Sequence, residues 1–244
     1  MKAGIVGLPN VGKSTLFNCL SNTKANSANF PFCTIEPNHS IINVPDKRIN
    51  ILNELVNPEK TIPATVEIVD IAGLVKGASK GEGLGNKFLA NIRETDAIIH
   101  VLRCFDDDNI AHVDGSVDPV RDKEIIDIEL QLKDLETVQN RLEKVKKTSK
   151  SGDKSSLEEL GVLKEIVSHL ESSRNIRSIS DEIKKKVHIL KPLQLLTSKP
   201  VLYVCNVDER SVTDGNNYVS SVMNLVEKEN VQVITLAAGI EAEI

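Results

Sequence analysis

The chain is poor in aromatic residues and cysteines and has no long apolar run. It has no tryptophan, and aromatic residues make up 3% of its 244 positions, so a stacking surface for single-stranded nucleic acid is not expected. No apolar run approaches the length of about 18 residues that a membrane-spanning helix needs, which predicts a protein without membrane contact. Its four cysteines contain no C-x-x-C pair, which argues against a zinc site or redox dithiol and suits free thiols: Cys19, Cys33, Cys104 and Cys205.

A glycine-bearing stretch near the amino end, residues 7–15, contains the pattern G-x₄-G-K-[S/T]. It follows an apolar run at 3–6 and precedes a helical pattern at 13–20, which is the setting of a phosphate-binding loop. Main-chain N–H groups of such a loop form an anion nest. We therefore expect Lys13 to reach the β- and γ-phosphates and Ser14 to ligate Mg²⁺. The predicted nucleotide-binding residues of the loop are Asn10, Val11, Gly12, Lys13, Ser14 and Thr15.

Apolar runs alternate with helical patterns after this loop. Strands are predicted at residues 2–6, 38–44, 64–71, 97–103, 200–206 and 231–236. This alternation predicts an α/β fold with a mostly parallel sheet, of the P-loop nucleotide hydrolase type. Residues 118–198 differ, because their apolar residues recur at three- and four-residue spacing. We expect two long helices paired as an antiparallel hairpin, then a shorter helix near 180–190. The predicted domains are a phosphate-loop domain, 1–117 and 199–244, and a helical insertion, 118–198.

Two further motifs indicate a nucleotide-dependent switch. Asp70 and Gly73 end a predicted strand, where Asp70 can act on Mg²⁺ through water and the Gly73 amide can meet the γ-phosphate. Thr34, twenty residues after Ser14, can offer Mg²⁺ a second hydroxyl. Leu74 stands where most switch GTPases have a glutamine that orients water. Leucine cannot bind water, so slow unassisted hydrolysis is expected.

The residues expected near the base are Asn206-Val207-Asp208-Glu209, where guanine-binding proteins usually carry N-K-x-D. Valine replaces lysine and the longer glutamate replaces aspartate, so much of the guanine preference should be lost. Asn206 can still bind a purine edge, and Val207 can pack on the ring face. Ala238, within Ala237-Ala238-Gly239, is expected to bring the main chain close to the base.

These motifs together resemble the Obg-related YchF family, the Obg-like ATPases. The residues that carry the resemblance are GLPNVGKST (7–15), NFPFCTIEPN (29–38), DIAGLVKGASKGEGLGNKFLANIRE (70–94), RCFDDDNIAHV (103–113) and NVDE (206–209). Members of that family have a G domain with a helical-hairpin insertion and a C-terminal TGS domain, and this chain ends just after the last base-contacting motif. The resemblance implies that the chain lacks the TGS domain.

The resemblance also implies activity, cofactors and partners. It implies binding and slow hydrolysis of ATP, with GTP weaker or comparable, and association with ribosomes or RNA. By resemblance, His112 replaces the missing catalytic glutamine, and Asn10 resembles the asparagine that ligates K⁺ in potassium-activated relatives. Catalysis is thus expected from His112, Lys13, Asp70 and Gly73, with Mg²⁺ on Ser14 and Thr34. A monomer is expected. The phosphate loop begins at residue 7, which leaves no room for a signal peptide before it and predicts a cytoplasmic location.

An alternative of a different class stays open. The chain could be a nucleotide-gated module with GTP preference that docks on the ribosome or RNA, with hydrolysis only as a timer. Two groups of lysines suggest this alternative: Lys144, Lys146, Lys147, Lys150 and Lys154, and Lys184, Lys185 and Lys186. Most such runs are solvated helix faces.

Overall fold

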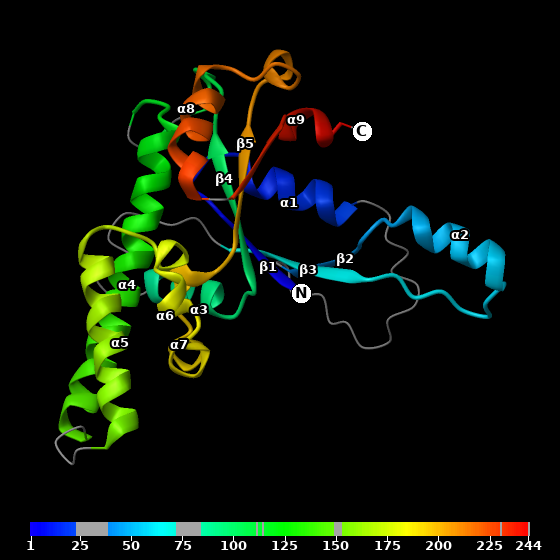
Figure 1. The fold of residues 1–244 in the computed structure, drawn as a ribbon. Coiled ribbons are helices and arrows are strands. Elements are labelled where there is room, and N and C mark those ends of the chain that lie inside the picture. The colour runs from blue at the N-terminus through cyan, green and yellow to red at the C-terminus, as the bar shows by residue number, and fades with distance from the viewer. Residues whose placement is uncertain are drawn as a thin grey trace.

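The computed structural model describes residues 1–22, 39–71, 84–110, 112–113, 115–148, 153–229 and 231–243. Its centre is a six-stranded sheet in the order β2-β3-β1-β4-β5-β6 (Figure 1). The strands are β1 (Lys2–Val6), β2 (His39–Asn43), β3 (Thr65–Asp70), β4 (Ala97–Arg103), β5 (Val201–Asn206) and β6 (Gln232–Leu236). Only the pair of β2 and β3 is antiparallel among these strands. The predicted mostly parallel α/β sheet is therefore confirmed.

Helices cover both faces of this sheet. The α-helices that come next after β1, β2, β3, β5 and β6 are α1 (Lys13–Asn22), α2 (Lys47–Val56), α3 (Leu84–Arg93), α8 (Asn217–Val226) and α9 (Ala238–Glu241). Of these, α2 lies away from the sheet and has no buried residue (Figure 1). In Figure 1, α1 and α9 lie together on one side of the sheet and α4 and α8 on the other, and contacts join the members of each pair. The short helix α9 is not expected from the sequence. None of the described helices is both long and apolar enough to cross a bilayer.

The region predicted as a helical hairpin contains two long helices, α4 (Pro119–Thr148) and α5 (Lys154–Glu171), packed against each other. The single shorter helix predicted near 180–190 is instead two helices, α6 (Asp181–Lys184) and α7 (Val187–Leu193). The described residues also contain single turns of 3₁₀ helix: η4 (Ile176–Ser178), η5 (Leu196–Ser198), η6 (Glu209–Ser211) and η7 (Glu227–Glu229).

Polar side chains fix where several helices begin. Asp118 Oδ1 accepts hydrogen bonds from the main-chain N–H groups of Val120 and Arg121, each 3.1 Å long, at the start of α4. Asp153 accepts from the Ser156 N–H at 2.9 Å at the start of α5. Such caps satisfy N–H groups that have no partner within the helix, and each typically stabilises a helix by about 1 kcal/mol.

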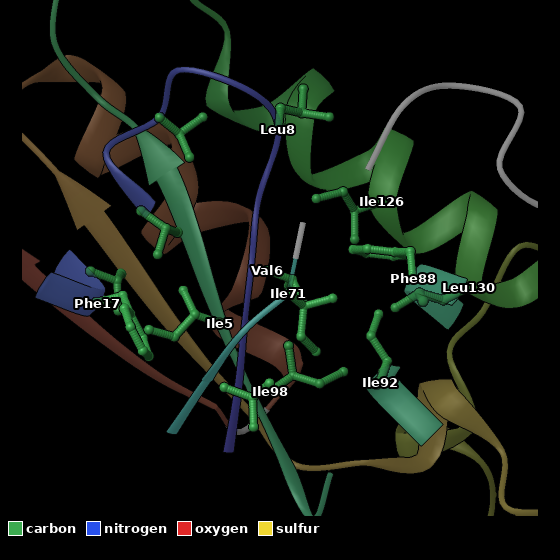
Figure 2. Packing of buried hydrophobic residues seen from close by; sticks show 14 of the residues in the cluster. Ile5, Val6, Leu8, Phe17, Ile71, Phe88, Ile92, Ile98, Ile126 and Leu130 are labelled. Carbon is green, nitrogen blue, oxygen red and sulfur yellow. The ribbon is translucent and has the colours of Figure 1, made fainter. Parts of the chain in front are cut away.

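The apolar core falls into separate clusters. One joins the sheet to α1, α3 and the first half of α4, and Figure 2 shows Phe88 beside Ile126 and Leu130, and Ile5 near Phe17. A second lies within the helical region and joins the second half of α4 to α5, α6 and α7. A third lies between α8 and the strands β4 and β5. Because α4 runs unbroken through two clusters, the domain boundary at residue 118 stays a prediction.

Candidate functional site

The phosphate loop leaves β1 after Val6 and curls back into α1, which begins at Lys13. Two glycines make the curl possible. A Cβ at Gly7 would lie 2.7 Å from the Val101 carbonyl oxygen on β4, so any side chain there would push the loop off the sheet. Gly12 has φ +92°, a value that L side chains rarely adopt, and Asn10 has φ 63°. Hence the residues of the motif have the left-handed turns that an anion nest requires.

Lys13, Ser14 and Asp70 meet at this loop although 56 residues separate Ser14 from Asp70. Asp70 ends β3, and its register partner Ile5 lies on the adjacent strand β1, so both strands bring their carboxyl ends to the same place. Lys13 Nζ donates to Asp70 Oδ1, and Ser14 Oγ donates to Asp70 Oδ2 at 3.2 Å. The side chains of Lys13 and Asp70 are 10% and 15% exposed. A cation, a hydroxyl and a carboxylate therefore converge where the helix dipole favours an anion.

This donor set suits Mg²⁺. Magnesium prefers oxygen ligands and keeps several waters, so one or two protein oxygens plus phosphate oxygens are usual. Ser14 Oγ and the Asp70 carboxylate supply such oxygens side by side. Among the described residues no group of three or more histidine, cysteine, aspartate or glutamate side chains could hold a metal ion. A dedicated all-protein metal cage is therefore not part of the described chain.

Thr34 and Gly73, which the sequence places at this site, lie outside the described residues, as does Leu74. Thr15 is half-buried and is the third residue of α1, and Val11 is buried. The site as described thus consists of the loop, the start of α1 and the end of β3.

Asn206 connects the phosphate loop to the last helix. Its Nδ2 donates to the Val11 carbonyl oxygen and its Oδ1 accepts from the Ala238 N–H, each at 2.9 Å. The side chain is buried and lies so close to Gly12 that a Cβ there would be 2.2 Å from Nδ2. The structure therefore brings Asn206 and Ala238 to the phosphate loop, with the amide engaged by the main chain on both sides.

Val207 lies in the apolar core, whereas the sequence predicts that it packs on the ring face of a base. Its side chain is 3% exposed and packs in the cluster between α8 and the strands β4 and β5. The side chain of Val207 is thus part of the apolar core beside the site, and its stacking on a purine ring stays a prediction. Asp208 is engaged as well, because its carboxylate caps η6 through the Ser211 N–H and hydroxyl at 3.1 Å. Glu209 is exposed.

The His112 side chain is buried and lies within hydrogen-bond distance of a buried carboxylate. Its Nε2 is 2.9 Å from Asp122 Oδ2 at the start of α4, and the two side chains are 4% and 1% exposed. Arg121 Nη2 lies 3.3 Å from the other carboxylate oxygen of Asp122. Burial raises the pKa of Asp122, against the opposing effects of His112 and Arg121. A histidine in an acidic loop is usually solvated, and this one is not.

Sequence reasoning missed Arg103, which shapes the loop before His112. The side chain is 1% exposed at the end of β4. Its guanidinium donates to the carbonyl oxygens of Phe105, Ile110 and Asp107, at 3.1, 2.9 and 3.1 Å. An arginine at the end of a mostly apolar strand is the signal that could have revealed it, because a buried guanidinium must find acceptors.

Comparisons with known proteins agree with this geometry. A sequence model of the family described as 50S ribosome-binding GTPase matches residues 2–144. The chain is similar to proteins named ribosome-binding ATPase YchF, 53% identical over 246 residues in Bacillus subtilis and 50% identical over 243 residues in Escherichia coli O157:H7. These alignments cover 100% of this chain and 67% and 66% of the relatives. The solved structure of the Schizosaccharomyces pombe YchF GTPase is 39% identical with a TM-score of 0.84, and the match covers 100% of this chain and 67% of that one.

The chain therefore spans about two thirds of the length of the relatives it matches.

Proposed function

Because the chain belongs to the YchF family, within the 50S ribosome-binding GTPases, we propose that it is a switch that binds and slowly hydrolyses ATP with Mg²⁺ and associates with ribosomes. GTP is the weaker or comparable ligand. The names of the relatives support both the ATPase activity and the ribosome partner. A cytoplasmic location follows from such a partner.

One observation carries the nucleotide-binding part. Lys13, Ser14 and Asp70 meet beside a loop whose Gly12 has a left-handed backbone. The Lys13 ammonium exchanges its Asp70 partner for the β- and γ-phosphates, and the N–H groups of the loop bind phosphate oxygens. The residues proposed to bind nucleotide are Asn10, Val11, Gly12, Lys13, Ser14, Thr15, Asn206 and Ala238.

Ser14 and, beyond the described residues, Thr34 are proposed to hold Mg²⁺, with Asp70 acting through water. When bound there, Mg²⁺ neutralises charge on the phosphate oxygens. Asn10 as a K⁺ ligand stays a prediction, supported only by its place in the loop. The Gly73 amide is proposed to meet the γ-phosphate.

Hydrolysis is proposed to be slow because Leu74 cannot orient water. His112 is proposed to take that role and bind the attacking water. The nearby acid Asp122 supports this, because a carboxylate bound to an imidazole fixes the imidazole's orientation.

The docking module with GTP preference has less support. Several lysines of the two groups are paired with acids on helix surfaces: Lys146 with Glu143, Lys184 with Asp181 and Lys186 with Glu158. Such paired lysines attract a polyanion less than free ones. Ribosome association is therefore proposed from the relatives and not from these lysines.

The direct test is Lys13→Ala. The control is Lys164→Ala, at an exposed lysine of α5. Calorimetric titration with Mg·ATP should show an affinity at least about tenfold weaker in Lys13→Ala, because the phosphate-binding cation is lost. Phosphate release should fall with it. Unchanged affinity and unchanged release would refute the proposal. Ribosome cosedimentation with ATP and with ADP tests the partner separately.

A further inference from the structure

Helix α2 belongs to a segment, residues 44–64, that is closed at its base. The Val44 N–H donates to the Ala64 carbonyl oxygen at 2.8 Å. The Asp46 side chain caps the start of the helix by accepting from the Arg48 N–H at 3.0 Å. Local bonds therefore define this helix, and none of its ten residues is buried. A helix of this length is marginal in water by itself, so any surface that covers it adds to its stability.

The apolar face of α2 is exposed. Four apolar residues recur at helical spacing on one side of the helix, each between 56% and 74% exposed: Ile51, Leu52, Leu55 and Val56. Single exposed apolar residues are ordinary on a protein surface, but a patch of them marks a binding surface. Figure 1 shows α2 at the periphery of the molecule, beyond the end of the sheet. This face is therefore accessible to another molecule.

The charges of α2 indicate what covers this face. The helix begins at Lys47, and Glu54 follows seven residues later, so both lie on the same flank of the apolar face, next to Ile51. Both are exposed, and neither has an ion-pair partner among the described residues. A cation at the amino end and an anion near the carboxyl end also oppose the helix dipole. This order of charges is unfavourable in a solitary helix and favourable beside an antiparallel one.

We propose that α2 is the contact surface for a second copy of this chain, with the two α2 helices packed antiparallel about a two-fold axis near Ile51. This arrangement puts Lys47 beside Glu54 of the second copy, twice by symmetry, and brings the two apolar faces together. It also sets opposite helix dipoles side by side. A second copy is favoured over another protein because α2 itself supplies both members of each ion pair, as a two-fold contact requires.

The contact is expected to be weak. Two ten-residue helices bury less than the area of about 800 Å² per partner that stable interfaces have. We therefore expect a dissociation constant of about 0.1 mM. The monomer expected from the sequence is then the state at low concentration. None of the residues proposed to bind nucleotide lies on α2, so both copies keep their phosphate loops accessible.

Sedimentation velocity of the parent chain between about 10 μM and 1 mM measures this self-association. Lys47→Glu and Glu54→Lys should each raise the dissociation constant at least about tenfold, because like charges then face each other twice. Each change also suits the helix dipole, so thermal melting should show no loss of stability. An equimolar mixture of the two variants should associate again, because every lysine then faces a glutamate. Lys164→Glu, at an exposed residue of α5, is the control and should behave like the parent.

Three results would overturn the proposal. A parent chain that stays monomeric at 1 mM overturns it, even if ribosomes protect α2 from hydrogen exchange, because the occupant is then a different molecule. Self-association that neither charge reversal weakens shows that another surface carries the contact. A mixture that remains as monomeric as each variant alone shows that the ion pairs do not form between copies. Lys13→Ala tests nucleotide binding separately from all of these results.

Discussion

The phosphate side and the base side of the site use their polar groups differently. On the phosphate side Lys13 and Ser14 are bound to Asp70, a side chain that a ligand can replace as partner. On the base side the Asn206 amide is bound to main-chain groups on both of its ends, and Asp208 caps a turn of its own segment.

From this difference we expect a site that binds triphosphates well and discriminates poorly between purine bases. Groups bound to side chains can exchange partners when a ligand arrives. Groups bound to the main chain maintain the shape of the site, and their polar atoms are then not available to hydrogen-bond the edge of a base. Discrimination between purines needs donors and acceptors aimed at the base, which the described base side mostly lacks.

The largest expected loss of Mg·ATP affinity comes from a substitution at Gly12, where the phosphate side and the base side of the site are in contact. In Gly12→Ala a Cβ would lie 2.2 Å from Asn206 Nδ2 at a residue with φ +92°. Strain and clash of about 3 kcal/mol should weaken Mg·ATP binding by about a hundredfold. Gly161→Ala is the control, because nothing lies within 4 Å of a Cβ there and alanine favours α5. Calorimetry and thermal melting should show loss only in Gly12→Ala, and equal binding in both variants would contradict the geometry.

Asn206→Ala should cause the next largest loss of nucleotide affinity. It leaves the Ala238 N–H and the Val11 carbonyl without their side-chain partner, at a cost of about 1–3 kcal/mol. We expect about tenfold weaker binding of ATP and of GTP alike, because the loop as a whole loses its support. Asn224→Ala, at an exposed residue of α8, is the control. A loss confined to one purine nucleotide would show that Asn206 reads the base instead.

Glu209→Asp should have a smaller effect on affinity. The shorter carboxylate resembles the aspartate of N-K-x-D, so the affinity ratio should move toward GTP by a few-fold, less than about 1.4 kcal/mol. Exposed Glu227, replaced in the same way, serves as control. Fluorescence titrations with both nucleotides would measure the ratio, and an unchanged ratio would remove Glu209 from base recognition.

Asp134 should respond to pH and leave nucleotide affinity unchanged. Burial raises the pKa of Asp134 to about 6 in the folded chain, above the value of about 3.9 expected when unfolded. Between these values the folded state binds more protons, so this contribution to stability is fully present below about pH 4 and is lost as the pH rises through 6. The free energy of unfolding of the parent minus that of Asp134→Asn should rise by about 2–3 kcal/mol from pH 7 to pH 4. Denaturant titrations at both pH values would measure it, and a flat difference would contradict the shift.

The sequence predicted the parts of the fold that depend on local pattern. The glycine spacing of the phosphate loop, the apolar strands and the spacing of the long helices led to the sheet and to α4 and α5. The break between α6 and α7 and the short α9 were not predictable, because helices of four to seven residues depend on packing more than on propensity.

At the site, what escaped prediction depends on contacts across the chain. The pairing of His112 with Asp122 and the burial of Val207 follow from where α4 and α8 pack. Spacing predicts a long helix in this region, but not which loop lies against its first turn. The three carbonyl partners of Arg103 could likewise be known only from the path of the loop.

The contrast between the two sides is tested most directly by dissociation constants for ATP and GTP, measured side by side on the parent chain at millimolar Mg²⁺. The side chains on the phosphate side can exchange partners, and those on the base side are held by the main chain. Both nucleotides should therefore bind, with ATP at least as tight as GTP and the two dissociation constants within about tenfold of each other. GTP bound more than about a hundredfold tighter than ATP would contradict it.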